Sequence, residues 1–138
     1  MLKKTLLSFI CGFLVVGCVH WALAQDAAPV TSAQKWLEIM DQGQYAQTWE
    51  TASVYFKSMI SKEHWIAKVM PVRKSLGAVV SRTLNNSQHF TVLPGAPDGD
   101  YYVLSFKSAF VNKASAVETV TMMKEANGQW GLAGYFIK

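Results

Sequence analysis

The spacing of the apolar residues changes near Gly77, and this change constrains the fold more than any other feature of the sequence. Before Gly77 the apolar residues follow the spacing of one helix face, as in the run from Ala33 to Met40. After Gly77, β-branched and aromatic residues dominate, and turn signals such as the Asn-Gly pair at 127–128 divide them. This order predicts an α+β domain in which helices come first and an antiparallel meander follows.

Three helices are predicted in the first part of the chain. The first begins at residue 31 with a capping box and ends before Gly43, and the second spans 45–56 in one piece. The third spans 61–77, and Pro71 is expected to kink it or to make it restart. The helices would pack on one face of a curved four- to five-stranded sheet formed by the segments 79–84, 90–93, 101–111, 116–125 and 130–137.

Two-residue turns at 113–114 and 127–128 would fix the registers of the last three strands. They predict a core face made of Tyr102, Leu104, Phe106, Phe110, Val117, Met123, Trp130, Leu132 and Phe136. They place on the opposite face Val103, Lys107, Glu118, Val120, Met122, Tyr135 and Ile137. Because that second face mixes apolar and charged side chains, we expect it to bind a partner or a second copy, as in a homodimer.

The first 24 residues have the layout of a secretory signal peptide. Lys3 and Lys4 precede an apolar run, and Ala22-Leu23-Ala24 precedes the expected cleavage site. A permanent membrane helix is the weaker interpretation, because the apolar run is shorter than the about 20 residues that a spanning helix needs. Cleavage would leave a short linker at 25–30 and a single domain at 31–138, in the periplasm or outside the cell.

A second processing site competes with the first. Residues 15–18, Val-Val-Gly-Cys, resemble the lipobox of a bacterial lipoprotein, in which Cys18 becomes the lipid-bearing N-terminus. This alternative makes the protein an envelope lipoprotein. Cys11 and Cys18 are the only cysteines, so cleavage after Ala24 would leave a domain with no disulfide and no zinc-thiolate site.

The charge of the chain argues against a nucleic-acid partner. Without Lys3 and Lys4, 11 basic and 9 acidic residues leave a net charge of +2, and the basic residues form no run. We therefore expect an unknown protein or a small ligand as partner, and membrane contact only if Cys18 is lipidated.

Several motifs together cover nearly the whole predicted mature domain. They are Trp36-Leu37, Asp41, Gly43, Tyr45 and Trp49; Phe56-Lys57 and Trp65; Val72-Arg73 with Leu76-Gly77; Ser81-Arg82-Thr83; Leu-Pro-Gly-Ala-Pro-Asp-Gly-Asp-Tyr at 93–101; Glu118-Thr119-Val120-Thr121; and the closing Ala133-Gly134-Tyr135-Phe136-Ile137. This pattern resembles the domain of unknown function 4019, found in exported bacterial proteins. The resemblance implies export and a fold, and it implies no activity.

The order of elements also resembles, by analogy, the cystatin-like or nuclear-transport-factor-2-like fold. Folds of this kind host isomerases, dehydratases, ligand binders and interaction modules, so the analogy leaves the function open.

The candidate binding residues include Arg73 and Arg82, the only arginines of the chain. They would converge on a carboxylate or phosphate ligand, and the alternative is an internal ion pair with Glu118 or Asp41. Asp41 and Tyr45 lie four residues apart and would suit acid-base work in a cavity, although ordinary helix-end chemistry explains them as well.

Glu118 and Tyr135 complete the candidate binding residues, on the predicted second face of the sheet. The alternative for Glu118 is a cross-strand pair with Lys107. No catalytic residue, metal site or cofactor is assigned. His64 and His89 have no partner at metal-ligand spacing, and the acidic pair at 98–100 fits a turn better than a calcium loop.

Three functions are consistent with the sequence. A noncatalytic module that binds a protein or a small ligand fits best, because the predicted core face carries no acid or base. The alternatives are a small cavity enzyme of the isomerase or dehydratase kind, in which Asp41, His64 or Arg82 would share an enclosed pocket, and a lipid-anchored accessory subunit of an envelope complex.

Overall fold

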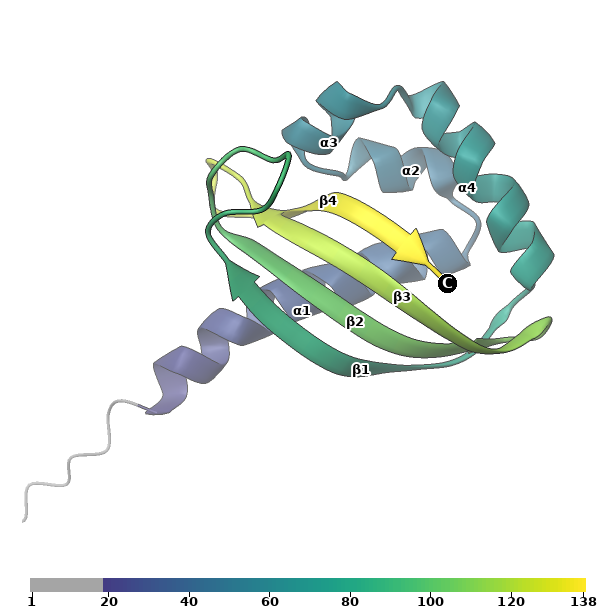
Figure 1. The fold of residues 1–138 in the computed structure, drawn as a ribbon, viewed down its shortest axis with the longest axis horizontal. Helices are drawn as coiled ribbons and strands as arrows, with labels where there is room; N and C mark the ends of the chain where they lie inside the picture. Colours follow the sequence, from purple (N-terminus) through teal and green to yellow (C-terminus); the bar gives the residue numbers. More distant parts are fainter. Residues whose placement is uncertain (1–18) are drawn as a thin grey trace, which may run out of the picture.

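The computed structural model describes residues 19–138 as four helices followed by a four-stranded antiparallel sheet (Figure 1). The helices are α1 (Val19–Asp41), α2 (Tyr45–Glu50), α3 (Val54–Met59) and α4 (Lys62–Leu76). The strands are β1 (Val79–Phe90), β2 (Tyr101–Phe110), β3 (Lys113–Lys124) and β4 (Trp130–Ile137). They lie in the sheet in chain order, so the predicted α+β class and the order of helices before strands are confirmed.

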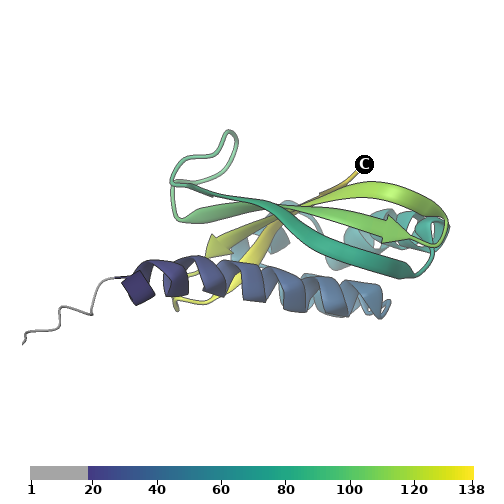
Figure 2. The same ribbon diagram turned by 90° about the horizontal axis from the view of Figure 1, so that it is seen from below.

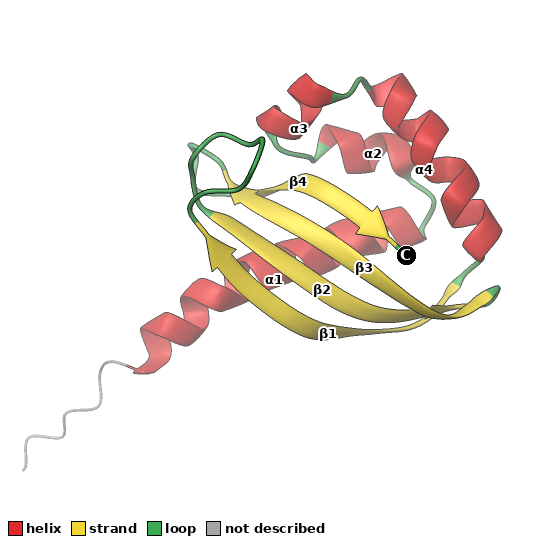
Figure 3. Ribbon diagram, viewed as in Figure 1, coloured by secondary structure: helices red, strands yellow, loops and turns green. Residues whose placement is uncertain are grey.

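The helices cover the sheet unevenly. Helix α1 crosses one face of the sheet, behind it in Figure 1 and beneath it in Figure 2. Helices α2, α3 and α4 lie beside β4, at one edge of the sheet, as the colouring by structure in Figure 3 shows. Strand β1 forms the other edge.

The prediction of three helices is wrong, because the predicted second helix is broken at Ser53. The Ser53 N–H donates to the Leu132 carbonyl of β4 (2.9 Å), and its hydroxyl accepts from the Phe56 N–H (3.0 Å) as the N-cap of α3. These two bonds hold Ser53 in an extended conformation, with φ −61° and ψ 155°. A helix cannot continue through that conformation, and two short helices result.

The connection between α2 and α3, which contains Ser53, approaches β4 so closely that Gly131 has no room for a side chain. A Cβ atom at Gly131 would lie 2.9 Å from the Ser53 backbone nitrogen and 3.0 Å from its Cα. We expect Gly131→Ala to lower the free energy of unfolding by about 1–3 kcal/mol, the usual cost of overpacking, in urea titrations. Gly134→Ala is the matched control, because its Cβ would lie 3.7 Å from Thr121. Equal effects of the two changes would contradict the close approach.

Two further expectations concern the helices: the linker and the restart at Pro71 differ from the structure, whereas the helix end at Gly77 is confirmed. Residues 25–30, expected as a linker, lie within α1, and Pro29 is inside that helix. Helix α4 continues through Pro71 without a restart and ends before Gly77, whose φ is 76°. Pro71 and Ala67 are both exposed, so water can bond the Ala67 carbonyl that loses its helical donor.

The predicted register of β3 is wrong, and the error exchanges the two faces of that strand. Phe110 pairs with Lys113, so the turn lies at 111–112 instead of 113–114, and Phe106 faces Glu118. The shift is an odd number of residues, and successive side chains of a strand point to opposite faces. Glu118, Val120 and Met122 therefore lie in the core, and Val117 and Met123 lie on the outer face.

The turn before β4 also differs from the predicted two-residue turn. The Glu125 N–H donates to the Gln129 carbonyl, and Gly128 has a φ of 82° inside a three-residue loop at 126–128. A register shift between Thr121 and Met122 follows in the same pair of strands. The loop and this shift offset one another, so Phe136 pairs with Thr119 as predicted. Because the faces of β3 are exchanged, both residues lie on the outer face, and Phe136, predicted in the core, is 60% exposed.

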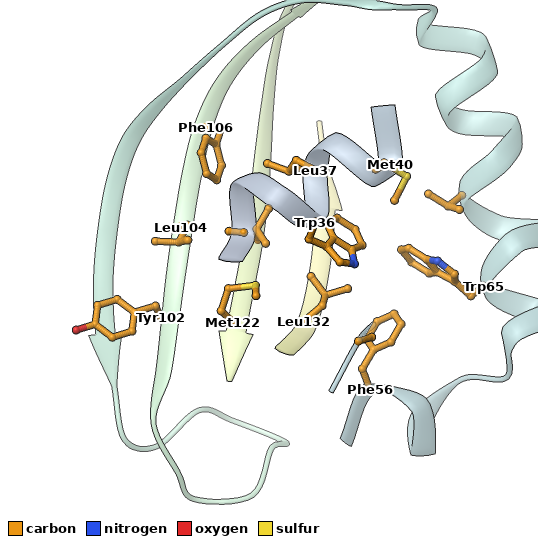
Figure 4. Packing of buried hydrophobic residues seen from close by; sticks show 14 residues of the cluster. Trp36, Leu37, Met40, Phe56, Trp65, Tyr102, Leu104, Phe106, Met122 and Leu132 are labelled. Carbon is orange, nitrogen blue, oxygen red and sulfur yellow. The ribbon is translucent and has the colours of Figure 1, made fainter. Parts of the chain in front are cut away.

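The core lies between α1, the sheet and the short helices, as Figure 4 shows. Trp36 and Trp65 meet there over Thr48, which is fully buried. Trp36 donates to the Thr48 carbonyl and Trp65 to the Thr48 hydroxyl, both at 2.9 Å, so both indole N–H groups have partners. The predicted core positions confirmed by burial are Tyr102, Leu104, Phe106, Phe110 and Leu132.

Candidate functional site

Five of the six candidate binding residues meet in one cluster at the end of α1. Asp41 is the last residue of α1, Arg73 lies in the last turn of α4, and Arg82 lies on β1. Together with Ser108 of β2, Glu118 of β3 and Tyr135 of β4 they form what we call the ion cluster. All four strands and two helices therefore contribute one side chain each.

Glu118 is the centre of the ion cluster and has no exposed surface. One carboxylate oxygen accepts from Arg82 Nε (2.7 Å) and from the Ser108 hydroxyl (2.6 Å). The other accepts from the Tyr135 hydroxyl (2.5 Å) and from Arg73 Nη1 (3.3 Å). These four bonds use the lone pairs of both oxygens, as a fully buried carboxylate requires.

Asp41 binds the same two arginines from the helical side. Its Oδ1 accepts from Arg73 Nη2 (2.6 Å) and Arg82 Nη2 (2.9 Å), and its Oδ2 accepts from Arg82 Nη1 (2.7 Å). The negative end of the α1 dipole makes the end of that helix a poor place for a carboxylate. The two guanidinium groups offset this repulsion and hold the helix end on the sheet.

The ion cluster is electrically balanced and nearly closed to water. Two arginines face two carboxylates, and the side chains of Arg73, Arg82 and Asp41 are only 4%, 14% and 18% exposed. The Arg73 guanidinium also lies over the Phe110 ring, 4.9 Å from its centre. None of the buried side-chain nitrogen and oxygen atoms of the described residues lacks a partner.

The protonation states inside the cluster are fixed by its own contacts. Burial raises the pKa of Tyr135, and the charge and hydrogen bond of Glu118 raise it further, so the phenol stays protonated and donates. Burial alone would lower the pKa of Arg82, but its hydrogen bonds and charge interactions with Asp41 and Glu118 raise the pKa overall. Burial alone would also lower the pKa of Arg73, but its charge interactions and hydrogen bonds with Tyr135 and Asp41 outweigh burial and raise the pKa overall.

Asp41 makes the stability of the fold depend on pH in the acidic range. Burial alone would raise its pKa, but hydrogen bonds and charges of Arg82 and Arg73 outweigh burial and hold the pKa below its ordinary 3.8. A carboxyl with a lowered pKa in the folded state stabilises the fold above the unfolded pKa, and this contribution disappears as the pH falls through the folded pKa. We therefore expect the wild type to lose more stability than Asp41→Asn between about pH 5 and pH 2, in urea titrations at each pH. Parallel pH profiles would contradict this role of Asp41.

The other predicted site residues lie elsewhere. Tyr45 is half-buried against the core and makes no bond to the ion cluster that the structure shows. Lys107 is exposed on the outer face and pairs in register with Val117, so the alternative of a cross-strand pair between Lys107 and Glu118 is wrong. His64 is exposed near the start of α4, and His89 binds Asp100 at the surface, 3.1 Å apart.

Ser108 is the cluster residue that the sequence analysis missed. It lies between Phe106 and Phe110, which were both predicted to face the core. A polar side chain at a core position of a strand needs a buried partner, and that partner is Glu118. This alternation was the available signal for a polar group inside the domain.

Neither a cluster of metal ligands nor a membrane-spanning helix is found among the described residues. Within residues 19–138 no three His, Cys, Asp or Glu side chains gather as a metal site. In the same range, no helix has the length and apolar character needed to cross a membrane.

The fold and the ion cluster define a small helix-and-sheet domain held together by a buried, neutral set of charges. The chain belongs to the DUF4019 family, proteins of unknown function, whose family model matches residues 32–135. The predicted membership is thereby confirmed. Among curated proteins no match is found.

A solved structure of a protein from Catenulispora acidiphila has a similar fold. The TM-score is 0.55 at 13% sequence identity, and the likeness covers 86% of this chain and 94% of that one. At this identity the likeness concerns the fold alone.

Proposed function

We propose that this chain is an exported domain that binds another protein or a small ligand and has no catalytic activity of its own. The ion cluster is the observation that carries the proposal. Its charges cancel, and both carboxylates accept all their hydrogen bonds from residues of the same chain. Such a cluster holds elements in place and has no vacant position for a reacting group.

The protonation states support the noncatalytic function. A general acid or base works best with a pKa near the working pH and with a proton or lone pair directed at the substrate. Here Asp41 is kept ionised, and Arg73, Arg82 and Tyr135 are kept protonated. The cavity-enzyme alternative expected Asp41, His64 or Arg82 to share an enclosed pocket; Asp41 and Arg82 instead bind each other, and His64 lies near the opposite end of α4 from Arg73.

The function can be tested by cross-linking in intact envelopes. A binding domain is expected to give a defined adduct whose mass exceeds that of the protein and which survives washing and dilution. The control is the same treatment after the envelope has been solubilised in denaturant. A protein that stays a bare monomer under every native condition would contradict the binding of another protein and would leave only a small ligand.

The finer fold assignment and the location belong to the same proposal. Four helices before a curved antiparallel sheet are compatible by analogy with cystatin-like or nuclear-transport-factor-2-like domains, which include binding modules. Export rests on the basic, apolar and small-residue layout of the first 24 residues. Lys3, Lys4, Cys11 and Cys18 lie outside the described residues.

Intact mass of the mature protein from a native envelope fraction reads out its processing. We expect a mass that begins at Gln25, which corresponds to a freely diffusing domain. A mass that begins at an acylated Cys18 would instead support the lipid-anchored subunit of an envelope complex. A mass that includes Met1 would contradict both forms of export.

A further inference from the structure

We propose that the groove between α4 and β4 binds an extended peptide segment of a partner protein, which adds a strand to the edge of the sheet. The inference rests on the proposed binding function and names its partner class. The groove has a volume of about 250 Å³ and is lined by Trp65, Lys68, Val69 and Val72 of α4 and by Tyr135, Phe136 and Ile137 of β4.

The outer edge of β4 offers unpaired backbone groups along this groove. Val117 and Lys138 exchange both of their backbone bonds, so by the alternation of an antiparallel ladder Phe136 also bonds toward β3. Tyr135 and Ile137 then direct their N–H and C=O groups away from β3. Within the described part of the chain, neither residue makes a backbone bond on that side.

The chain itself already uses the neighbouring part of this edge. Ser53 donates its backbone N–H to the Leu132 carbonyl, and the connection between α2 and α3 covers that stretch of β4. Beyond Leu132 the cover ends and the groove begins. A peptide strand would therefore extend a backbone contact that the fold makes once with its own residues.

The side chains of the groove are suited to the alternating side chains of a strand. Val72 and Phe136 are 44% and 60% exposed, although both are large and apolar. A strand added to β4 would cover part of this surface with every second side chain. Lys68 is the only charged residue among the described residues that line the groove, so a carboxylate on the peptide would find a complementary charge and no opposing acid there.

A second copy of the chain fits this edge less well than a single strand does. Helix α4 runs beside β4 on the edge side of the sheet (Figure 1). A second sheet paired through its own β4 would need to place its β3 in the space that α4 occupies, because neighbouring strands lie about 4.8 Å apart. An isolated extended segment has no such neighbour and can enter the groove.

The experiment compares backbone and side-chain variants at one position. A phage-displayed library of random nine-residue peptides is selected on the processed protein, and the enriched peptides are then measured by fluorescence anisotropy. Ile137→Pro removes one outward N–H and no bond to β3, a change that an edge strand tolerates. Ile137→Ala is the matched control, since it shortens the side chain and keeps the N–H.

The expected result has three parts. Enriched peptides alternate apolar residues and carry at least one Asp or Glu. Their affinity falls about tenfold in Ile137→Pro and in Val72→Glu, which puts a charge on the apolar side of the groove, and it changes about twofold or less in Ile137→Ala. Circular dichroism and thermal melting show whether each variant is folded, and Val72→Glu serves alone if Ile137→Pro is not.

The remaining outcomes overturn the proposal in distinguishable ways. Peptides that bind all variants equally would place binding elsewhere and would leave the binding function intact. Equal losses in Ile137→Pro and Ile137→Ala would show recognition of the side chain without strand addition. A dimer in light scattering that Ile137→Pro dissociates would identify a second copy as the occupant. If no peptide is enriched, the proposed peptide partner is contradicted, and the cross-linking experiment still decides separately whether the domain binds another protein.

Discussion

Replacement of Glu118 by alanine is expected to lower the free energy of unfolding by about 3–5 kcal/mol, the usual cost of removing one member of a buried ion pair. Among residues 19–138, the change leaves Arg73 and Arg82 with Asp41 as their only acidic partner. It also removes the acceptor of the Ser108 and Tyr135 hydroxyls. Urea titration followed by tryptophan fluorescence measures the loss.

The matched control is an acidic residue in a surface ion pair. Glu50 lies 3.1 Å from Lys62, and both side chains are well exposed, at 54% and 38%. Glu50→Ala should change stability by about 1 kcal/mol or less, because water already solvates both charges. If Glu118→Ala costs no more than Glu50→Ala, the ion cluster does not hold the fold together. Glu118→Gln should fall between the two, since it keeps one acceptor oxygen and loses the charge.

Replacement of Trp65 by alanine is expected to cost a similar amount, about 3–5 kcal/mol, through the cavity that it leaves. Trp65 is 7% exposed and stands edge-on to Phe56, with ring centres 5.1 Å apart. Its indole also donates to the Thr48 hydroxyl, which is buried. Thermal melting and urea titration together measure the effect.

Trp65→Phe separates packing from hydrogen bonding at this position. The phenyl ring keeps most of the apolar contact and loses the bond to Thr48, so we expect a loss of about 1–2 kcal/mol. An alanine variant no less stable than the phenylalanine variant would show that the aromatic packing contributes little. Because Trp65 also lines the groove beside β4, its alanine variant should bind enriched peptides more weakly even where it is folded.

The sequence was sufficient for the elements that follow from local chemistry. The helix end at Gly77 could be predicted because a positive φ suits glycine, and the Ser61 N-cap because its hydroxyl accepts a backbone N–H, here that of His64. The break at Ser53 could not, because it depends on a bond to Leu132, which lies far along the chain. Local spacing alone favours one continuous helix there.

The burial of Glu118 could not be predicted for a related reason. Neither residues 111–112, where the turn lies, nor residues 113–114, where it was predicted, contain glycine or proline. The sequence therefore gives no local reason to prefer one turn over the other. An error of register then moved Glu118 from the core to the surface of the predicted sheet. The two arginines were candidates because the chain has no others, and an ion pair with Glu118 or Asp41 was one alternative for them. The sequence therefore identified most members of the cluster, but it did not predict that Glu118 is fully buried.

The residues of the ion cluster come from widely separated parts of the sequence, and this separation affects how the domain unfolds. Asp41 and Tyr135 lie near opposite ends of the domain's sequence. Between them in the sequence, four different elements contribute Arg73, Arg82, Ser108 and Glu118. The cluster can exclude water only when all six elements are in place, so we expect it to form late in folding. Interactions that are absent from the folding transition state act on the unfolding rate. For the exported domain that we propose, the cluster would therefore set how long the folded state lasts, independently of how quickly it forms.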